Sequence, residues 1–221
     1  MNLAFFGFSA VGLLFTCYAF SFYRVTSKGF SNLHSGSYAC GYFSVALAFL
    51  TWSIAVLYKP FPQTSILAGD AFLLLSTLCF LNVLINCDLK ARSILLAVAS
   101  VVAILLFWLR STYYPPQAYV ENGVLVFNTP LAVAILLDAV FLFVWLPTNL
   151  YVARIISKAV PIEGMPLAYS FIYAILTVSA ILFIAFKTVP LIIISFIIIG
   201  ISFILLFASN YIISTLFPSK L

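Results

Sequence analysis

The chain contains very little charge. Only 7% of its 221 residues are charged, and 65% are hydrophobic. A soluble globular protein carries about 25% charged residues, so this chain could not cover its apolar surface in water. The mean hydropathy of +1.24 agrees with that. We therefore expect the lipid bilayer to be its solvent.

Residues that carry catalytic chemistry are also scarce. The chain has five acidic residues and a single histidine, His34, with no second histidine or Cys-Cys pair nearby in the sequence, which makes a poor metal site. The sequence has no paired carboxylates at one membrane depth, no His-Glu metal motif, no Gly-x-Ser-x-Gly turn and no phosphate loop. Nothing therefore favours an enzyme. The cysteines, predicted to be free, buried thiols, are Cys17, Cys40, Cys79 and Cys87.

Apolar stretches of membrane-spanning length fill most of the chain. A spanning helix needs roughly 20 mostly apolar residues. The stretches are Leu3–Tyr23, Tyr38–Tyr58, Ile66–Cys87, Ser93–Leu109, Leu131–Ile155, Met165–Phe186 and Val189–Phe217. We expect an all-α membrane protein, a seven-helix bundle forming one domain over residues 1–221. The fourth stretch is short and the seventh is long, which predicts a tilted last helix.

The basic residues predict the orientation of the bundle. With the N-terminus outside, the inner segments hold Arg24, Lys28, Lys90, Arg92, Arg154, Lys158 and Lys220. The outer segments then hold Lys59, Arg110 and Lys187. Because basic residues collect on the cytoplasmic side, we expect the N-terminus outside and the C-terminus inside a plasma membrane that the chain crosses several times. The net charge of +5 favours contact with anionic lipid headgroups and not with nucleic acid.

The longest outer segment carries a hairpin pattern. Within 117–128, Ala-Tyr-Val-Glu is followed by Asn122-Gly123 and then by Val-Leu-Val-Phe. Asn-Gly favours a two-residue turn, and both flanks are rich in strand-forming residues. We predict a small extracellular β-hairpin between the fourth and fifth helices, lying as a lid over the bundle. A plain ordered loop is the alternative.

One acidic residue lies deep in an apolar stretch. Asp138 is roughly 12 Å below the outer end of the fifth helix, and ionisable groups at such depth commonly face the bundle interior. Phe141, Trp145 and Asn149 share its helical face. Pro147 removes a backbone hydrogen bond and predicts a kink. This face is a candidate ligand-binding surface.

Other helices offer polar partners for that surface. Asp70 lies near the outer end of the third helix, and Arg110 at the outer end of the fourth is the nearest cation for Asp70 or Asp138. Tyr173 shares a face of the sixth helix with Tyr169. The predicted ligand-binding residues are Asp138, Trp145, Asn149, Asp70, Tyr173 and Arg110.

A structural role is the alternative for all polar residues in the helices. Hydrogen bonds between membrane helices contribute about 0.6 kcal/mol each and hold bundles together. Ser195, Ser202 and Ser209 recur every seven residues on the last helix, and we interpret this stripe as helix packing. For Asp138, an ion pair with Arg110 competes with a role in ligand, proton or ion binding.

The predicted plan resembles that of microbial rhodopsins, in topology alone. That family binds retinal through a lysine in the middle of its last helix, and Val189–Phe217 contains no lysine. A retinal Schiff base is therefore not expected, and no cofactor is predicted. Small sugar carriers share the size and orientation, but they need two similar halves, and Pro147 has no equivalent in the first helix.

The function that the sequence favours is that of a receptor-like or sensor-like bundle. Such a protein would bind a small apolar or amphipathic ligand in its outer half, since ligand pockets are mostly apolar with a few polar groups. Its expected partners are the bilayer, a small-molecule ligand and a membrane or cytoplasmic protein that reads the inner loops. The alternatives are a transporter or channel for small solutes or ions, and an accessory membrane subunit.

Overall fold

The structure is a computed structural model. It describes the backbone of residues 3–26, 35–57, 63–85, 89–115, 118–121, 124–127, 130–159, 168–169, 171–176, 178–179 and 189–216. Its elements are α1 (Leu3–Thr26), α2 (Ser35–Leu57), α3 (Gln63–Leu84), α4 (Leu89–Tyr113), β1 (Ala118–Glu121), β2 (Val124–Phe127), α5 (Leu131–Val140), η1 (Phe141–Trp145), α6 (Leu146–Ala159) and α8 (Val189–Leu216). Five of them, α1 to α4 and α8, are long and apolar enough to cross a membrane. The chain is an integral, multi-pass membrane protein.

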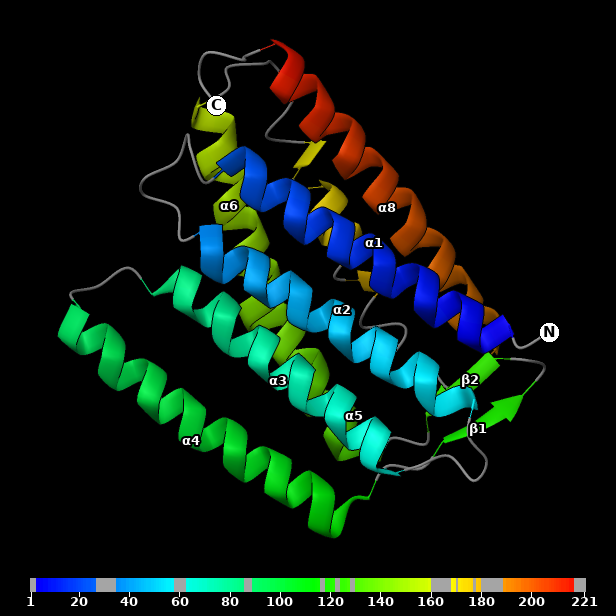
Figure 1. Ribbon diagram of the computed structural model, residues 1–221. Helices are drawn as coiled ribbons and strands as arrows, with labels where there is room; N and C mark the ends of the chain where they lie inside the picture. Colours follow the sequence, from blue (N-terminus) through cyan, green and yellow to red (C-terminus); the bar gives the residue numbers. More distant parts are fainter. Residues whose placement is uncertain are drawn as a thin grey trace.

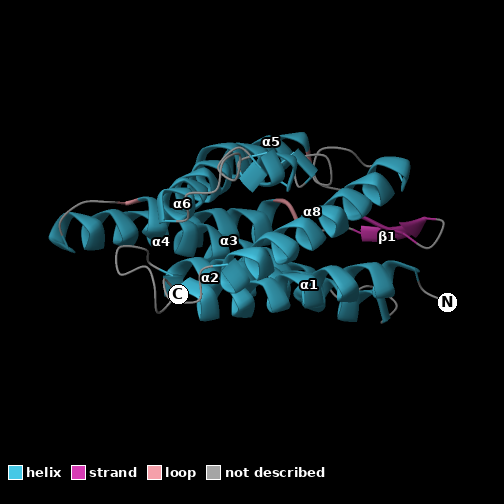
Figure 2. Cartoon of the chain, turned by 90° about the horizontal axis from the view of Figure 1, so that it is seen from above, coloured by secondary structure: helices cyan, strands magenta, loops and turns pink. Residues whose placement is uncertain are grey.

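The long helices lie side by side in the order α4, α3, α2, α1 and α8 (Figure 1), and α8 runs obliquely to the others (Figure 2). α1, α2 and α3 are neighbours in chain order, α8 packs on α1, and α4 packs on α3. The segment α5–η1–α6 lies on a second level, where η1 and α6 contact α3 (Figure 2). We call the end at which α1 begins, and near which β1 and β2 lie, the hairpin end, and the opposite end the far end. α3 is the hub of the described bundle, because α2, α4, η1 and α6 all contact it.

Aromatic rings from several helices interlock in the core. Phe15 of α1 meets Phe203 of α8 edge to face, with ring centroids 4.6 Å apart. Phe80 of α3 meets Trp145 of η1 in the same way at 4.9 Å. Such pairs contribute about 0.5–1.5 kcal/mol beyond the burial of their surface. Because lipid removes the usual hydrophobic drive for helices to associate, this packing is a main source of cohesion.

Two glycines on the α2–α3 seam let large rings approach the backbone. A Cβ atom built on Gly41 would lie 2.5 Å from a ring carbon of Phe80. One built on Gly69 would overlap the indole of Trp52. The Trp52 indole also donates a hydrogen bond to the Ile66 carbonyl, at 3.3 Å. Small residues at these two positions therefore set the distance between α2 and α3.

The fourth apolar stretch forms a longer helix than predicted. α4 runs over 25 residues and includes Lys90, Arg92 and Arg110, where the prediction ended short at Ser93–Leu109. The charges are tolerated because they sit near the helix ends, where the two arginines bind groups of α3. No residue of the stretch from Lys90 to Tyr113 is buried, so α4 lies at the edge of the described bundle.

The fifth apolar stretch is helical but irregular. It consists of α5, the π-helical turn η1 and α6, which together span the predicted Leu131–Ile155. Pro147 has no N–H to donate, and its ring would clash with the carbonyl four residues earlier, that of Phe143. Phe143 lies inside η1, and a π-turn relaxes the spacing at that point. The π-turn is thus an irregularity beside Pro147, and the kink itself stays a prediction.

Two short strands follow α4. β1 and β2 pair antiparallel, with Ala118 opposite Phe127 and Glu121 opposite Val124, and the turn residues between them lie outside the described residues. Val126 of β2 is buried against Ile192 at the start of α8. The strands thus lie beside α1 and α8.

The sixth apolar stretch lies largely outside the described residues. Its described parts, 168–169, 171–176 and 178–179, are helical, and Tyr169, Ile172 and Leu176 are buried in the core. α8 is the longest described helix, at 28 residues, and it matches the predicted last helix.

The described cysteines are free, as predicted, but they are not all buried. Cys17 and Cys40 are exposed on the sides of α1 and α2, and Cys79 of α3 is partly buried. Cys87 lies outside the described residues. On the side of a membrane-spanning helix, a thiol is an acceptable small apolar side chain.

We predict that Gly69→Ala destabilises the bundle by about 1–3 kcal/mol, the usual cost of overpacking a core. The added methyl group would push the Trp52 indole away from α3 and break its hydrogen bond to the Ile66 carbonyl. Thermal unfolding in detergent micelles, followed by circular dichroism, measures the effect. Gly200→Ala is the matched control, because nothing lies within 4 Å of the added carbon. Equal midpoints for both variants would contradict the prediction.

Candidate functional site

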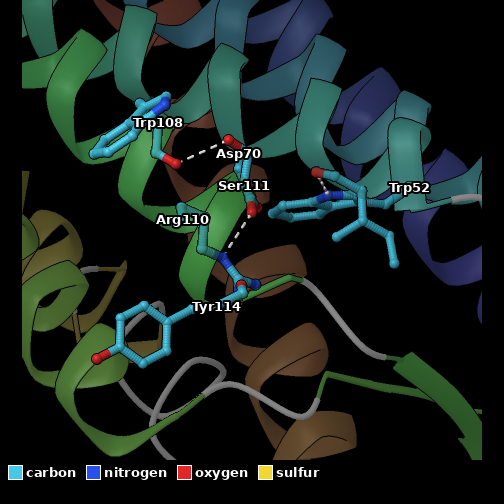
Figure 3. A network of polar contacts seen from close by, with 7 residues as sticks. Trp52, Asp70, Trp108, Arg110, Ser111 and Tyr114 are labelled. Atoms are coloured by element: carbon cyan, nitrogen blue, oxygen red, sulfur yellow. Dashed lines mark hydrogen bonds and ion pairs between the residues drawn. The ribbon is translucent and has the colours of Figure 1, made fainter.

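An ion pair joins α3 and α4 near the hairpin end. Arg110 Nε lies 3.2 Å from Asp70 Oδ2, and Arg110 Nη1 also donates to the carbonyl of Tyr114 (Figure 3). The two side chains are 12% and 22% exposed, so the pair is largely withdrawn from its surroundings. Asp70 is thus one of the two acids that the sequence offered as a partner for Arg110. The pair is thus partly buried, and losing one partner would leave the other charge without its counter-charge beside apolar side chains.

A cavity of about 60 Å³ lies beside this ion pair. It is bounded by α3, α4 and α5, and its lining is apolar except for the pair itself. The lining residues are Asp70, Leu73, Leu74, Leu106, Phe107, Arg110, Val133, Leu136 and Val140. We call it the α3–α4–α5 cavity. A single water needs roughly 10–15 Å³ of such volume, so there is room for about four to six groups of that size.

A second arginine fastens α4 to α3 at the far end. Arg92 Nε donates to Asn82 Oδ1 at 2.9 Å, and Arg92 Nη2 donates to the Asn82 carbonyl at 2.6 Å. Asn82 Nδ2 in turn donates to Ser37 Oγ of α2, at 2.7 Å. The Asn82 carbonyl is in the last turn of α3, where carbonyls lack helical partners and a cation is favourable. The part of α4 at the far end is therefore coupled to both α2 and α3.

A buried polar cluster lies toward the far end of the bundle. The hydroxyls of Tyr38 and Tyr42 both donate to Asn149 Oδ1, at 2.5 and 2.7 Å. The hydroxyls of Tyr18 and Tyr173 lie 2.5 Å apart. All five side chains are almost completely buried. We call them the tyrosine cluster, and it joins α1, α2, α6 and the helical segment 171–176.

Trp145 lies between the cavity and the tyrosine cluster along the bundle. Its indole donates to Thr77 Oγ1 at 3.4 Å and packs on the ring of Phe80. One turn on, Thr148 donates to the carbonyl of Phe80 at 3.3 Å. These contacts fix the register between α3 and the segment from η1 to α6, so Trp145 forms part of the core.

The six predicted ligand-binding residues do not form one site. Asp70 and Arg110 line the α3–α4–α5 cavity. Trp145, Asn149 and Tyr173 face inward as predicted, but they lie in the core and toward the far end, away from that cavity. These three side chains are buried and lie at a different depth from Asp70 and Arg110. The backbone of Asp138 is part of α5, and its side chain lies outside the described residues.

The strands do not line the cavity either. All its lining residues come from α3, α4 and α5, while β2 lies against α1 and α8. Among the described residues, the strands of the predicted lid therefore lie beside a different part of the hairpin end from the cavity.

Sequence reasoning missed the tyrosine partners of Asn149. Tyr38 and Tyr42 are four residues apart and so share one face of α2, and Tyr18 lies well inside α1. A tyrosine hydroxyl within hydrocarbon needs a hydrogen-bond partner. That requirement is the signal that could have linked these residues to Asn149.

Comparison of the chain with models of known protein families, with curated proteins and with solved structures finds no match.

We predict that Asn149→Leu destabilises the bundle by about 2 kcal/mol, because it removes the acceptor of two buried hydroxyls. The same substitution in a Tyr38→Phe, Tyr42→Phe background should cost much less, since no hydroxyl is then left without its partner. Thermal unfolding in detergent micelles checks both values. Ser195→Ala serves as the control, because the Ser195 hydroxyl bonds to the Leu191 carbonyl of its own helix. An equal cost in both backgrounds would rule out the hydrogen bonds as the cause.

Proposed function

We propose that this protein is a receptor-like or sensor-like seven-helix bundle of the plasma membrane that binds a small apolar or amphipathic ligand in its outer half. The observation that carries the proposal is the α3–α4–α5 cavity, apolar throughout except for the Asp70–Arg110 pair. Ligand sites usually have this composition: apolar walls for affinity and a few polar groups for orientation.

Seven spans with the N-terminus outside are part of the proposal. The helical pieces between 168 and 179 support a sixth span, because their buried residues join the same core as the long helices. The distribution of basic residues supports the orientation. The hairpin end, and with it the cavity and the strands β1 and β2, then lies on the outer side.

α4 is the element best suited to respond to a ligand. It buries none of its apolar stretch and is held by Arg110 at one end and Arg92 at the other. A ligand entering the cavity would press on Leu106 and Phe107 of α4. The displacement would reach Asn82 and the inner ends of α2 and α3 through Arg92. A partner protein that binds at the inner side, where α6 ends at Ala159, would detect the change.

Transport is the second candidate. Polar groups occur at three depths of the bundle: the Asp70–Arg110 pair, the Thr77–Trp145 contact and the tyrosine cluster. A solute path needs polar groups at several depths. Within each of the three groups, however, the polar side chains bond to one another and do not line an open path. This arrangement favours the receptor-like function over transport. An accessory subunit would use the exposed apolar side of α4 as its contact surface.

We predict that Leu106→Trp abolishes ligand binding by filling the cavity. The probe is a diazirine-bearing hexadecanol in phosphatidylcholine nanodiscs, photolysed and mapped by mass spectrometry to peptides of α3, α4 and α5. Leu105→Trp is the matched control, because Leu105 is the preceding residue on α4 and is 53% exposed. Its labelling should equal that of the unmodified protein. Labelling that is equally strong in both variants would remove the cavity as the binding site.

The orientation predicts a labelling pattern for single cysteines. In a chain whose four native cysteines are replaced by serine, Gly123→Cys should react with a membrane-impermeant maleimide added to intact cells, and Lys158→Cys should react only after lysis. Gel shifts of the labelled protein report the result. The opposite pattern would mean that the bundle is inverted.

A further inference from the structure

The ion pair in the α3–α4–α5 cavity has unused hydrogen-bonding capacity. The Arg110 guanidinium has five N–H donors, and its bonds go to Asp70 Oδ2 and the Tyr114 carbonyl. Among the described residues, Arg110 Nη2 and Asp70 Oδ1 have no partner, and both residues line the cavity. The pair is therefore the only charged group among the described lining residues, and it retains one donor and one acceptor that no described residue uses.

The pair carries no net charge, which limits what it can bind. A ligand anion would be attracted by Arg110 but repelled by Asp70, and a ligand cation would meet the reverse. Each would have to leave water without gaining a free counter-charge, which is costly in a membrane interior. A hydroxyl group can accept from Arg110 and donate to Asp70 in the same position. It also loses far less hydration than an ion does.

From this we infer that the ligand is a hydroxyl-bearing lipid, bound with its neutral hydroxyl group against Asp70 and Arg110 and its first methylene groups against the apolar lining. The inference rests on the proposed function. The volume of about 60 Å³ fits the hydroxyl and the first few carbons of such a chain. The rest of the chain would continue outside the cavity along the exposed apolar side chains of α4 or α5.

Three probes with one chain and different headgroups test the inference. They are diazirine-bearing hexadecanol, hexadecyl sulfonate and hexadecyltrimethylammonium, whose charges do not change with pH. In phosphatidylcholine nanodiscs, the cavity peptides of the unmodified protein should be labelled by the alcohol about tenfold more strongly than by either ion, a difference of about 1.4 kcal/mol. This comparison needs no variant, so it remains decisive if a variant does not fold.

Charge variants should switch the preference. Asp70→Asn leaves Arg110 as an unbalanced cation. The sulfonate probe should then label the cavity peptides about tenfold more strongly than in the unmodified protein. Arg110→Gln leaves the Asp70 carboxylate, and the trimethylammonium probe should gain instead. Ser100→Ala is the control on α4, because the Ser100 hydroxyl bonds to the Leu96 carbonyl of the same helix. Its probe ratios should not change.

The outcomes separate the two proposals. If all three probes label the cavity equally and Leu106→Trp prevents labelling by each, the cavity binds ligands but the hydroxyl preference is overturned. A preference of the unmodified protein for either ion overturns it as well. If Leu106→Trp changes no labelling, the cavity is not a binding site and the proposed function fails with the inference.

Discussion

Polar side chains inside hydrocarbon must find their partners within the protein, and this constraint accounts for most of the described architecture. Arg110 forms an ion pair with Asp70, Arg92 donates a hydrogen bond to Asn82, and two tyrosine hydroxyls donate to Asn149. Each bond crosses from one helix to another, so each fixes a relative position that apolar packing alone would leave adjustable. The aromatic core then fills the space that these bonds define.

Both arginine contacts end on α3, which other helices also contact. Its glycine-bearing face receives Trp52 of α2, and Phe80 and Thr77 receive the segment from η1 to α6. Its two ends supply Asp70 and Asn82 to α4. Binding in the α3–α4–α5 cavity would therefore act on the helix with the most neighbours, which supports the receptor-like proposal on mechanical grounds.

The helices could be predicted well where apolar runs are long and are bounded by charge. α1 and α8 begin at the predicted residues. α4 was predicted too short because hydropathy counts Arg92 and Arg110 against a helix, and a single sequence does not reveal that each has a partner on α3. The strands β1 and β2 lie where Asn122-Gly123 and its flanks indicated.

The candidate site was predictable only in part. Helical periodicity identified the inward face that carries Trp145 and Asn149. The positions of Arg110 and Asp70, both near the outer ends of their helices, suggested that they could pair. The depth at which each side chain meets a neighbour depends on how helices cross, which periodicity does not contain. The tyrosine partners of Asn149 and the cavity itself belong to that level of structure.

The spacing of the two arginines on α4 has a consequence for the evolution of this helix. Arg92 and Arg110 are 18 residues apart (110 − 92), which is about five full turns, so both lie on the same side of the cylinder. Inserting or deleting a single residue between them would rotate one guanidinium by about 100° away from its anchor. Both contacts with α3 are therefore kept only while the number of residues between the two arginines is unchanged, so the spacing constrains the length of α4.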